Sequence, residues 1–118
     1  MPVRHMNVPT TNESWLVDAG DGVIQKRAHS GVGSLSPVER LIYCVWVADY
    51  GMRNAGDLET AHDVYSDFQP EAAQLARELG LQRTHSTFTL PTPELQRKYF
   101  DSFEEICNEI RRYAEPCL

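Results

Sequence analysis

The segment from Ser36 to Gly56 constrains the fold of this chain most, because it carries a helix start signal and a helix stop signal around an apolar centre. Ser36 is a favoured N-cap residue, Pro37 suits the first helical position and Glu39 completes a capping box. Eight consecutive apolar residues then leave no face of the middle suited to water. A buried strand of that length is the alternative, but the capping signal favours a helix. We therefore predict a buried central helix over residues 37–55.

The stretch before this helix is less constrained. Residues 12–29 place apolar side chains near helical spacing, yet their middle, Asp18-Ala19-Gly20-Asp21-Gly22, is turn-forming and leaves a short hairpin as an alternative. We favour a helix, because no other strand signal lies nearby to complete a sheet. Residues 1–11 are expected to form a flexible arm, and residues 30–35 a Gly/Ser linker.

Three further helices are predicted after residue 56. A short amphipathic helix follows Asp57, an Ala/Leu-rich helix spans residues 70–80, and a long amphipathic helix begins at Thr92. Residues 81–91, rich in Thr and Ser, are expected to form a connector, with Phe88 and Leu90 packed on the core. The predicted inner face of the last helix comprises Leu95, Tyr99, Phe100, Phe103, Ile106, Cys107, Ile110, Tyr113 and Ala114. The fold class is thus all-α, a compact bundle of about five helices around the central one.

Length and composition indicate one domain over residues 1–118. The net charge is −6, and residues 1–35 carry three basic and three acidic residues, so the acidic excess lies after them. Such a surface repels nucleic acid and anionic membranes and suits a basic protein partner, although solubility alone also explains it. Three cysteines without a CxxC pair argue against disulfides and zinc. No apolar run reaches the length of a membrane span or resembles a signal peptide, so we expect a cytoplasmic protein.

Asp49 is the first residue that could carry chemistry. On a helical projection it falls among apolar neighbours, so its carboxylate needs a partner or a raised pKa. A catalytic acid or base is one interpretation. The one we favour is structural, with Asp49 paired to Arg53 or accepting backbone amides of the turn over residues 51–56. Asp49, Arg53, Asn54 and Gly56 are therefore the candidate residues of a pocket at this turn.

Other sequence motifs for catalysis, metal binding or nucleotide binding are weak or absent from the sequence. The four histidines do not occur at metal-ligand spacing, and Thr84-His85-Ser86 lacks the surroundings of a catalytic serine. The chain contains no P-loop, GxGxxG or HExxH motif. We therefore predict no catalytic residue, no metal site and no cofactor.

The segment from Asp57 to Glu71 carries five acidic residues and neither Lys nor Arg. Its last four acids recur every four residues, a step that rises ~6 Å on a helix and is close to the axial rise of two phosphates along a DNA strand. Such a row could imitate a phosphate backbone, whereas the alternative is an ordinary solvated face. The candidate binding residues are Asp57, Glu59, Asp63, Asp67 and Glu71.

Leu35-Ser36-Pro37-Val38-Glu39-Arg40 resembles the helix start of a bacterial all-helical family of mostly unknown function, which includes a DNA-mimic protein. Residues 51–57 stand where that family has an Asn-Asn-Gly-Gly turn, with Asn54 and Gly56 in agreement, and residues 75–81 and 95–103 are similar to its later helices. The resemblance implies an all-helical, often dimeric protein. It also implies sequestration of a DNA-binding protein by acidic mimicry as one role.

Three functional hypotheses follow. The first is a non-enzymatic acidic module that binds a basic partner, such as a DNA-binding protein, through residues 57–71. The second is a small enzyme or ligand-binding protein with a pocket near Asp49 and the 51–57 turn. The third is an immunity-type protein that neutralises a toxin through the same acidic face.

Overall fold

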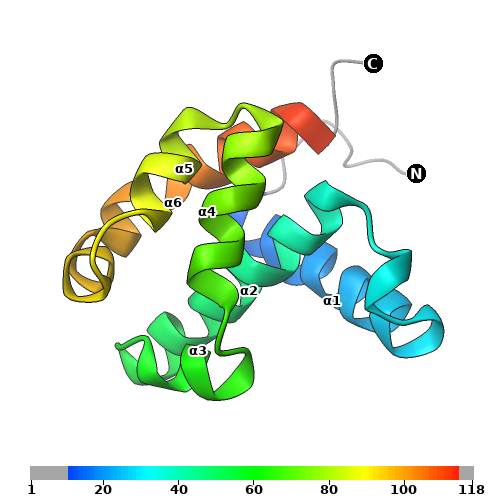
Figure 1. Cartoon of the computed structure of the whole chain (residues 1–118). Coiled ribbons are helices and arrows are strands. Elements are labelled where there is room, and N and C mark those ends of the chain that lie inside the picture. The colour runs from blue at the N-terminus through cyan, green and yellow to red at the C-terminus, as the bar shows by residue number, and fades with distance from the viewer. Residues whose placement is uncertain (1–10, 115–118) are drawn as a thin grey trace, which may run out of the picture.

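Six α-helices and one short 3₁₀ helix account for the regular structure of residues 11–114, the part of the chain that the computed structural model describes (Figure 1). No strand occurs among these residues, so the all-α prediction is confirmed and residues 12–29 do not form a hairpin. The predicted arm, residues 1–11, lies outside the described residues except for Thr11. In chain order, the elements are α1 (Asn12–Ser30), η1 (Val32–Ser34), α2 (Pro37–Ala55), α3 (Glu59–Val64), α4 (Phe68–Leu79), α5 (Gln82–Phe88) and α6 (Thr92–Ala114).

The helix α2 has the predicted bounds and the predicted central position. Both bonds of the capping box are present: the Ser36 amide donates to Glu39 Oε1 at 2.8 Å, and the Glu39 amide donates to Ser36 Oγ at 3.3 Å. Gly56 ends the helix in the left-handed conformation, with φ 74°. The helices α1, α3, α4 and α6 all pack against α2, and α4 crosses it in Figure 1. Its buried residues are Leu41, Ile42, Cys44, Val45, Val47, Ala48, Asp49, Gly51 and Met52.

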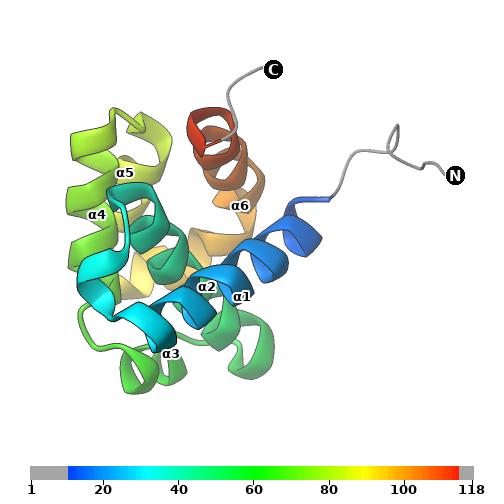
Figure 2. The same cartoon turned by 90° about the vertical axis from the view of Figure 1, so that its right-hand side faces the viewer.

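The helix α1 packs against α2 (Figure 2), and its first residue forms hydrogen bonds with α6. Its N-cap is Thr11, whose hydroxyl accepts from the Ser14 amide at 3.1 Å. The Asn12 side chain is instead buried, and its amide donates to Glu104 and Asn108 of α6. Tertiary contacts of this kind explain why a turn-rich sequence is helical here. The predicted linker contains the 3₁₀ turn η1.

The prediction of a connector over residues 81–91 is wrong in its first part, because residues 82–88 form α5. No residue at its start caps it locally. Glu109 of α6 does so from a distance, accepting the Arg83 amide at 2.9 Å and the Thr84 amide at 2.8 Å. Phe88 is buried and Leu90 packs against the core, as expected. The helix α5 thereby connects α4 to α6 and packs against both.

The helix α6 covers the core with a narrower apolar face than the sequence predicts. Phe100 and Tyr113 are each 47 % exposed, and Ala114 is exposed as well. Phe100 lies at the margin of the apolar face, whereas Tyr113 and Ala114 lie in the last turn of the helix. The residues of α6 that are buried are Leu95, Tyr99, Phe103, Ile106, Cys107 and Ile110. Among residues 11–114, no helix is both long enough and apolar enough to cross a bilayer.

Candidate functional site

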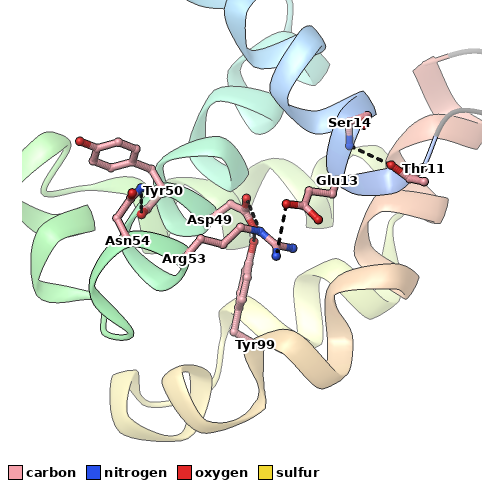
Figure 3. A network of polar contacts seen from close by, with 8 residues as sticks. All are labelled: Thr11, Glu13, Ser14, Asp49, Tyr50, Arg53, Asn54 and Tyr99. Atoms are coloured by element: carbon pink, nitrogen blue, oxygen red, sulfur yellow. Dashed lines mark hydrogen bonds and ion pairs between the residues drawn. The ribbon is translucent and has the colours of Figure 1, made fainter.

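Asp49 is buried, 5 % exposed, and two side chains form hydrogen bonds with its carboxylate (Figure 3). The Arg53 Nε donates to both of its carboxylate oxygens, at 3.1 and 3.0 Å. The Tyr99 hydroxyl of α6 donates to Oδ1 at 2.7 Å. The predicted pairing of Asp49 with Arg53 is therefore present, and Tyr99 is a partner that helical spacing within α2 could not reveal.

Arg53 extends this network beyond Asp49. Its guanidinium lies 3.7 Å from a Glu13 carboxylate oxygen of α1, and its centre is 5.1 and 4.8 Å from the ring centroids of Phe100 and Phe103 of α6. One side chain thus bridges three helices at the end of α2. Burial, with the Asp49 carboxylate beside it, raises the pKa of Tyr99 well above its usual value, so its hydroxyl keeps its proton and remains a donor. These contacts satisfy Asp49 and give it a structural role.

The other two residues of the predicted pocket end the helix. The Asn54 side-chain amide donates to the Tyr50 carbonyl at 2.8 Å, and the Gly56 amide donates to the Met52 carbonyl at 3.0 Å. Both residues are exposed. They therefore lie outside the buried network, although they are neighbours of Arg53 in sequence.

The acidic residues 57–71 do not share one helix, because α3 ends at Val64 and α4 begins at Phe68. Asp57 precedes α3, and its Oδ1 accepts the Glu59 amide at 3.1 Å. The amide of Leu58 donates to the Gln96 side chain of α6 at 3.0 Å. The six-residue helix α3 is thus capped partly by a distant helix, and the row of carboxylates at phosphate spacing is interrupted.

Glu71 is already neutralised within the fold. Its Oε2 lies 2.9 Å from Arg40 Nη2 of α2, and its other oxygen accepts the Tyr65 hydroxyl. This hydrogen bond raises the pKa of Tyr65. Its side chain is 16 % exposed, so Glu71 is a structural residue rather than part of an open surface.

The remaining three acids differ from Glu71. Glu59, Asp63 and Asp67 are exposed and make no ion pair with any residue of 11–114. Other carboxylates have cationic partners, as in the pairs Lys26–Glu39 and Arg83–Glu105. Glu59, Asp63 and Asp67, which we call the acidic triplet, therefore present uncompensated negative charge from α3 and the turn after it.

An open groove of about 870 Å³ lies along α4. His62 of α3 and His85 of α5 both line it, although sequence spacing does not link them. The Nδ1 of His62 lies 2.9 Å from the Leu58 carbonyl, and the Nδ1 of His85 lies 2.9 Å from the Ala73 carbonyl. Because a carbonyl oxygen only accepts, the Nδ1 atom of His62 and that of His85 each carry a proton and donate it. No group of three or more metal-binding side chains lies together in the described part of the chain.

The two described cysteines, Cys44 and Cys107, are buried and free. Burial raises the pKa of the Cys107 thiol to about 12, and it raises the pKa of Cys44 as well. A nucleophilic cysteine needs the opposite shift and some exposure, so neither thiol is suited to catalysis.

No protein-family model, no curated protein and no solved structure matches this chain. The family resemblance, which covers residues 35–114, therefore stays a prediction.

Proposed function

We propose that this protein is a non-enzymatic binding module whose acidic triplet captures a basic segment of a partner protein. The observation that carries the proposal is the lack of any cationic partner for Glu59, Asp63 and Asp67 within residues 11–114. Residues 57–71 contain no Lys or Arg that would dilute this charge.

The electrostatics of the acidic triplet favour such a partner. Glu59 and Asp63 lie four residues apart on α3, where like charges repel and weaken the helix slightly. A cationic segment would relieve that repulsion and would be steered toward the surface by a net charge of −6. The same field repels phosphate backbones and anionic lipids, so we propose neither nucleic acid nor membrane as a partner.

The small number of open carboxylates favours a partner that offers a short basic segment over one that offers a long, DNA-binding groove. Only three of the five predicted acids remain open, because Asp57 accepts a backbone amide and Glu71 is paired with Arg40. Basic toxins and DNA-binding proteins both present short cationic segments, so both classes stay within the proposal. The alternative of an enzyme at Asp49 has less support, because the carboxylate of Asp49 is bonded to Tyr99 and Arg53.

Charge reversal at one member of the triplet tests the proposal. Asp63→Lys is compared with Asp101→Lys, which makes the same charge change at an exposed acid of α6 that forms no ion pair within residues 11–114. Each variant and the wild type serve as bait in a host lysate at low and high salt. We expect capture of basic proteins at low salt by the wild type and Asp101→Lys, and its loss in Asp63→Lys and at high salt.

Equal capture by the two variants would contradict the proposal, because the location of the charge would then have no effect. Capture that persists at high salt would contradict it as well, since an electrostatic surface interaction is screened by salt.

A further inference from the structure

We infer that an aromatic strip on α2, formed by Tyr43, Trp46 and Tyr50, receives arginine side chains of the captured segment. This inference rests on the proposed function and names the partner chemistry more narrowly. The acidic triplet would supply long-range attraction, and the strip would supply the contact that distinguishes arginine from lysine.

The three rings of the aromatic strip form a continuous stack. The Tyr43 and Trp46 centroids are 6.4 Å apart with an interplanar angle of 12°, and the Trp46 and Tyr50 centroids are 5.5 Å apart at 18°. Tyr50 is 42 % exposed, and the other two rings are partly exposed. Figure 3 shows Tyr50 on the side of α2 turned away from Arg53. The strip is thus a stacked, partly exposed set of rings on a helix most of whose other apolar residues are buried.

Contacts with α1 show what borders the strip on one side. Glu13 is paired with Arg53, and a Cβ at Gly20 would overlap the Trp46 indole, so α1 and α2 run antiparallel. Val17, three residues before Gly20 on α1, is 46 % exposed.

The helix α3 borders the strip on the other side. Gly51 lies against α3, since a Cβ there would be 2.9 Å from the Ala61 amide nitrogen. At about 100° per residue, Tyr43 and Tyr50 project between Trp46, which faces α1, and Gly51, which faces α3. The strip therefore runs along the exposed side of α2 between the two helices.

The fold already uses arginine on aromatic rings. Arg27 lies 5.0 Å from the Tyr43 centroid, Arg53 lies over Phe103, and Arg111 lies 5.5 Å from the Trp15 centroid. Among residues 11–114, no such cation lies over Trp46 or Tyr50. Tyr50 is the last ring of the stack and is 42 % exposed, so it can receive a guanidinium from outside. A guanidinium stacks on aromatic rings better than an ammonium does.

Exposed acidic side chains on two of the helices that pack against α2 favour a cationic segment. Asp18 and Asp21 of α1 are exposed and unpaired within the described residues, as are Glu59 and Asp63 of α3. Acidic side chains thus occur on both helices that border the strip. A second copy of this chain is a poorer occupant, because each copy carries a net charge of −6.

The test compares an oligo-arginine peptide with an oligo-lysine peptide of the same length, by calorimetry at low salt. We expect the wild type to bind oligo-arginine about fivefold to tenfold more tightly, a ratio that matches one well-formed stacking contact. We expect Tyr50→Ser to remove this preference while oligo-lysine affinity stays unchanged. Tyr113→Ser is the control, because Tyr113 is 47 % exposed on α6 and lies outside the strip.

Asp63→Lys separates the inference from the proposed function, because it should weaken both peptides equally. Equal affinity of the wild type for the two peptides would overturn the inference and leave the proposed function standing. A preference that survives Tyr50→Ser would overturn it too, since the arginine contact would then lie elsewhere. Failure of both peptides to bind would overturn the proposed function and the inference with it. Circular dichroism checks that each variant is folded.

Discussion

The Tyr99 hydroxyl donates a hydrogen bond to Asp49 Oδ1 at 2.7 Å, across 50 positions of sequence. Both side chains are buried, and Arg53 bonds to both oxygens of the same carboxylate. This contact fixes the position of α6 against the end of α2. Asp49, the first candidate for a catalytic acid or base in the sequence, therefore has a structural role.

Tyr99→Phe tests this contact while keeping the ring in the core. We expect the free energy of unfolding to fall by about 1.5–3 kcal/mol, because a buried hydrogen bond to a charged group is lost. Urea unfolding measures the change. Tyr113→Phe is the matched control and should have no effect, since Tyr113 is exposed. Equal stabilities of the two variants would show that the Tyr99 hydroxyl contributes nothing.

Gly20 and Gly22 of α1 should respond to alanine in opposite directions. A Cβ at position 20 would overlap the Trp46 indole, whereas a Cβ at position 22 meets nothing within 4 Å. We expect Gly20→Ala to cost about 1–3 kcal/mol through overpacking. Gly22→Ala should stabilise the protein by about 0.5–1 kcal/mol through helix propensity. Thermal unfolding measures both changes. In a Trp46→Ala background, Gly20→Ala should no longer destabilise, and a persistent cost there would assign the effect to another contact.

Stability should fall at alkaline pH. The hydrogen bond to Glu71 raises the pKa of Tyr65, and burial raises the pKa of Tyr99, both from a usual value of 10.0. The unfolded chain then loses protons before the folded one, so the stabilisation is complete below pH 10 and declines as the pH rises toward the folded pKa values. The buried thiols act in the same direction from about pH 9. Urea midpoints on either side of pH 10 measure the decline, which should be shallower in Tyr65→Phe. A midpoint that stays constant with pH would refute this assignment.

Cys44 and Cys107 should be protected from thiol reagents in the native state. Both are fully buried, and their raised pKa values suppress the thiolate. With Cys117 replaced by Ser, we expect the reaction with a disulfide reagent to be on the order of a thousandfold slower than in denaturant, because it requires unfolding. Spectrophotometry follows the released thiolate. Rapid reaction of the native protein would mean that these residues are accessible.

Local sequence signals predict both ends of α2 correctly. Ser36, Glu39 and Gly56 all act on their own helix, and so does the pairing of Arg53 with Asp49 one turn away. Such contacts lie within a few positions and can be inferred from spacing alone.

Distant contacts account for what the sequence did not predict. The helix α5 depends on Glu109, which accepts amides 25 and 26 residues away. Glu71 is neutralised by Arg40, 31 residues earlier, so counting acids overstated the open charge. Tyr99 reaches Asp49, and His62 and His85 share a groove, only through the packing of separate helices. In each case the partner is set by tertiary structure.

The cap that Gln96 provides for α3 has a consequence for how the acidic triplet works. A helix of six residues is far below the ~12–15 residues that an isolated helix needs in water, so a peptide copied from residues 57–71 would be unstructured. The helical spacing of Glu59 and Asp63 therefore depends on the packing of α6, because Gln96 Oε1 of α6 accepts the Leu58 amide at the start of α3. A partner that recognises this spacing binds the folded chain alone and therefore shifts the unfolding equilibrium toward the native state. Partner binding and folding of the domain are then coupled, so a mutation that unfolds the domain also weakens partner binding.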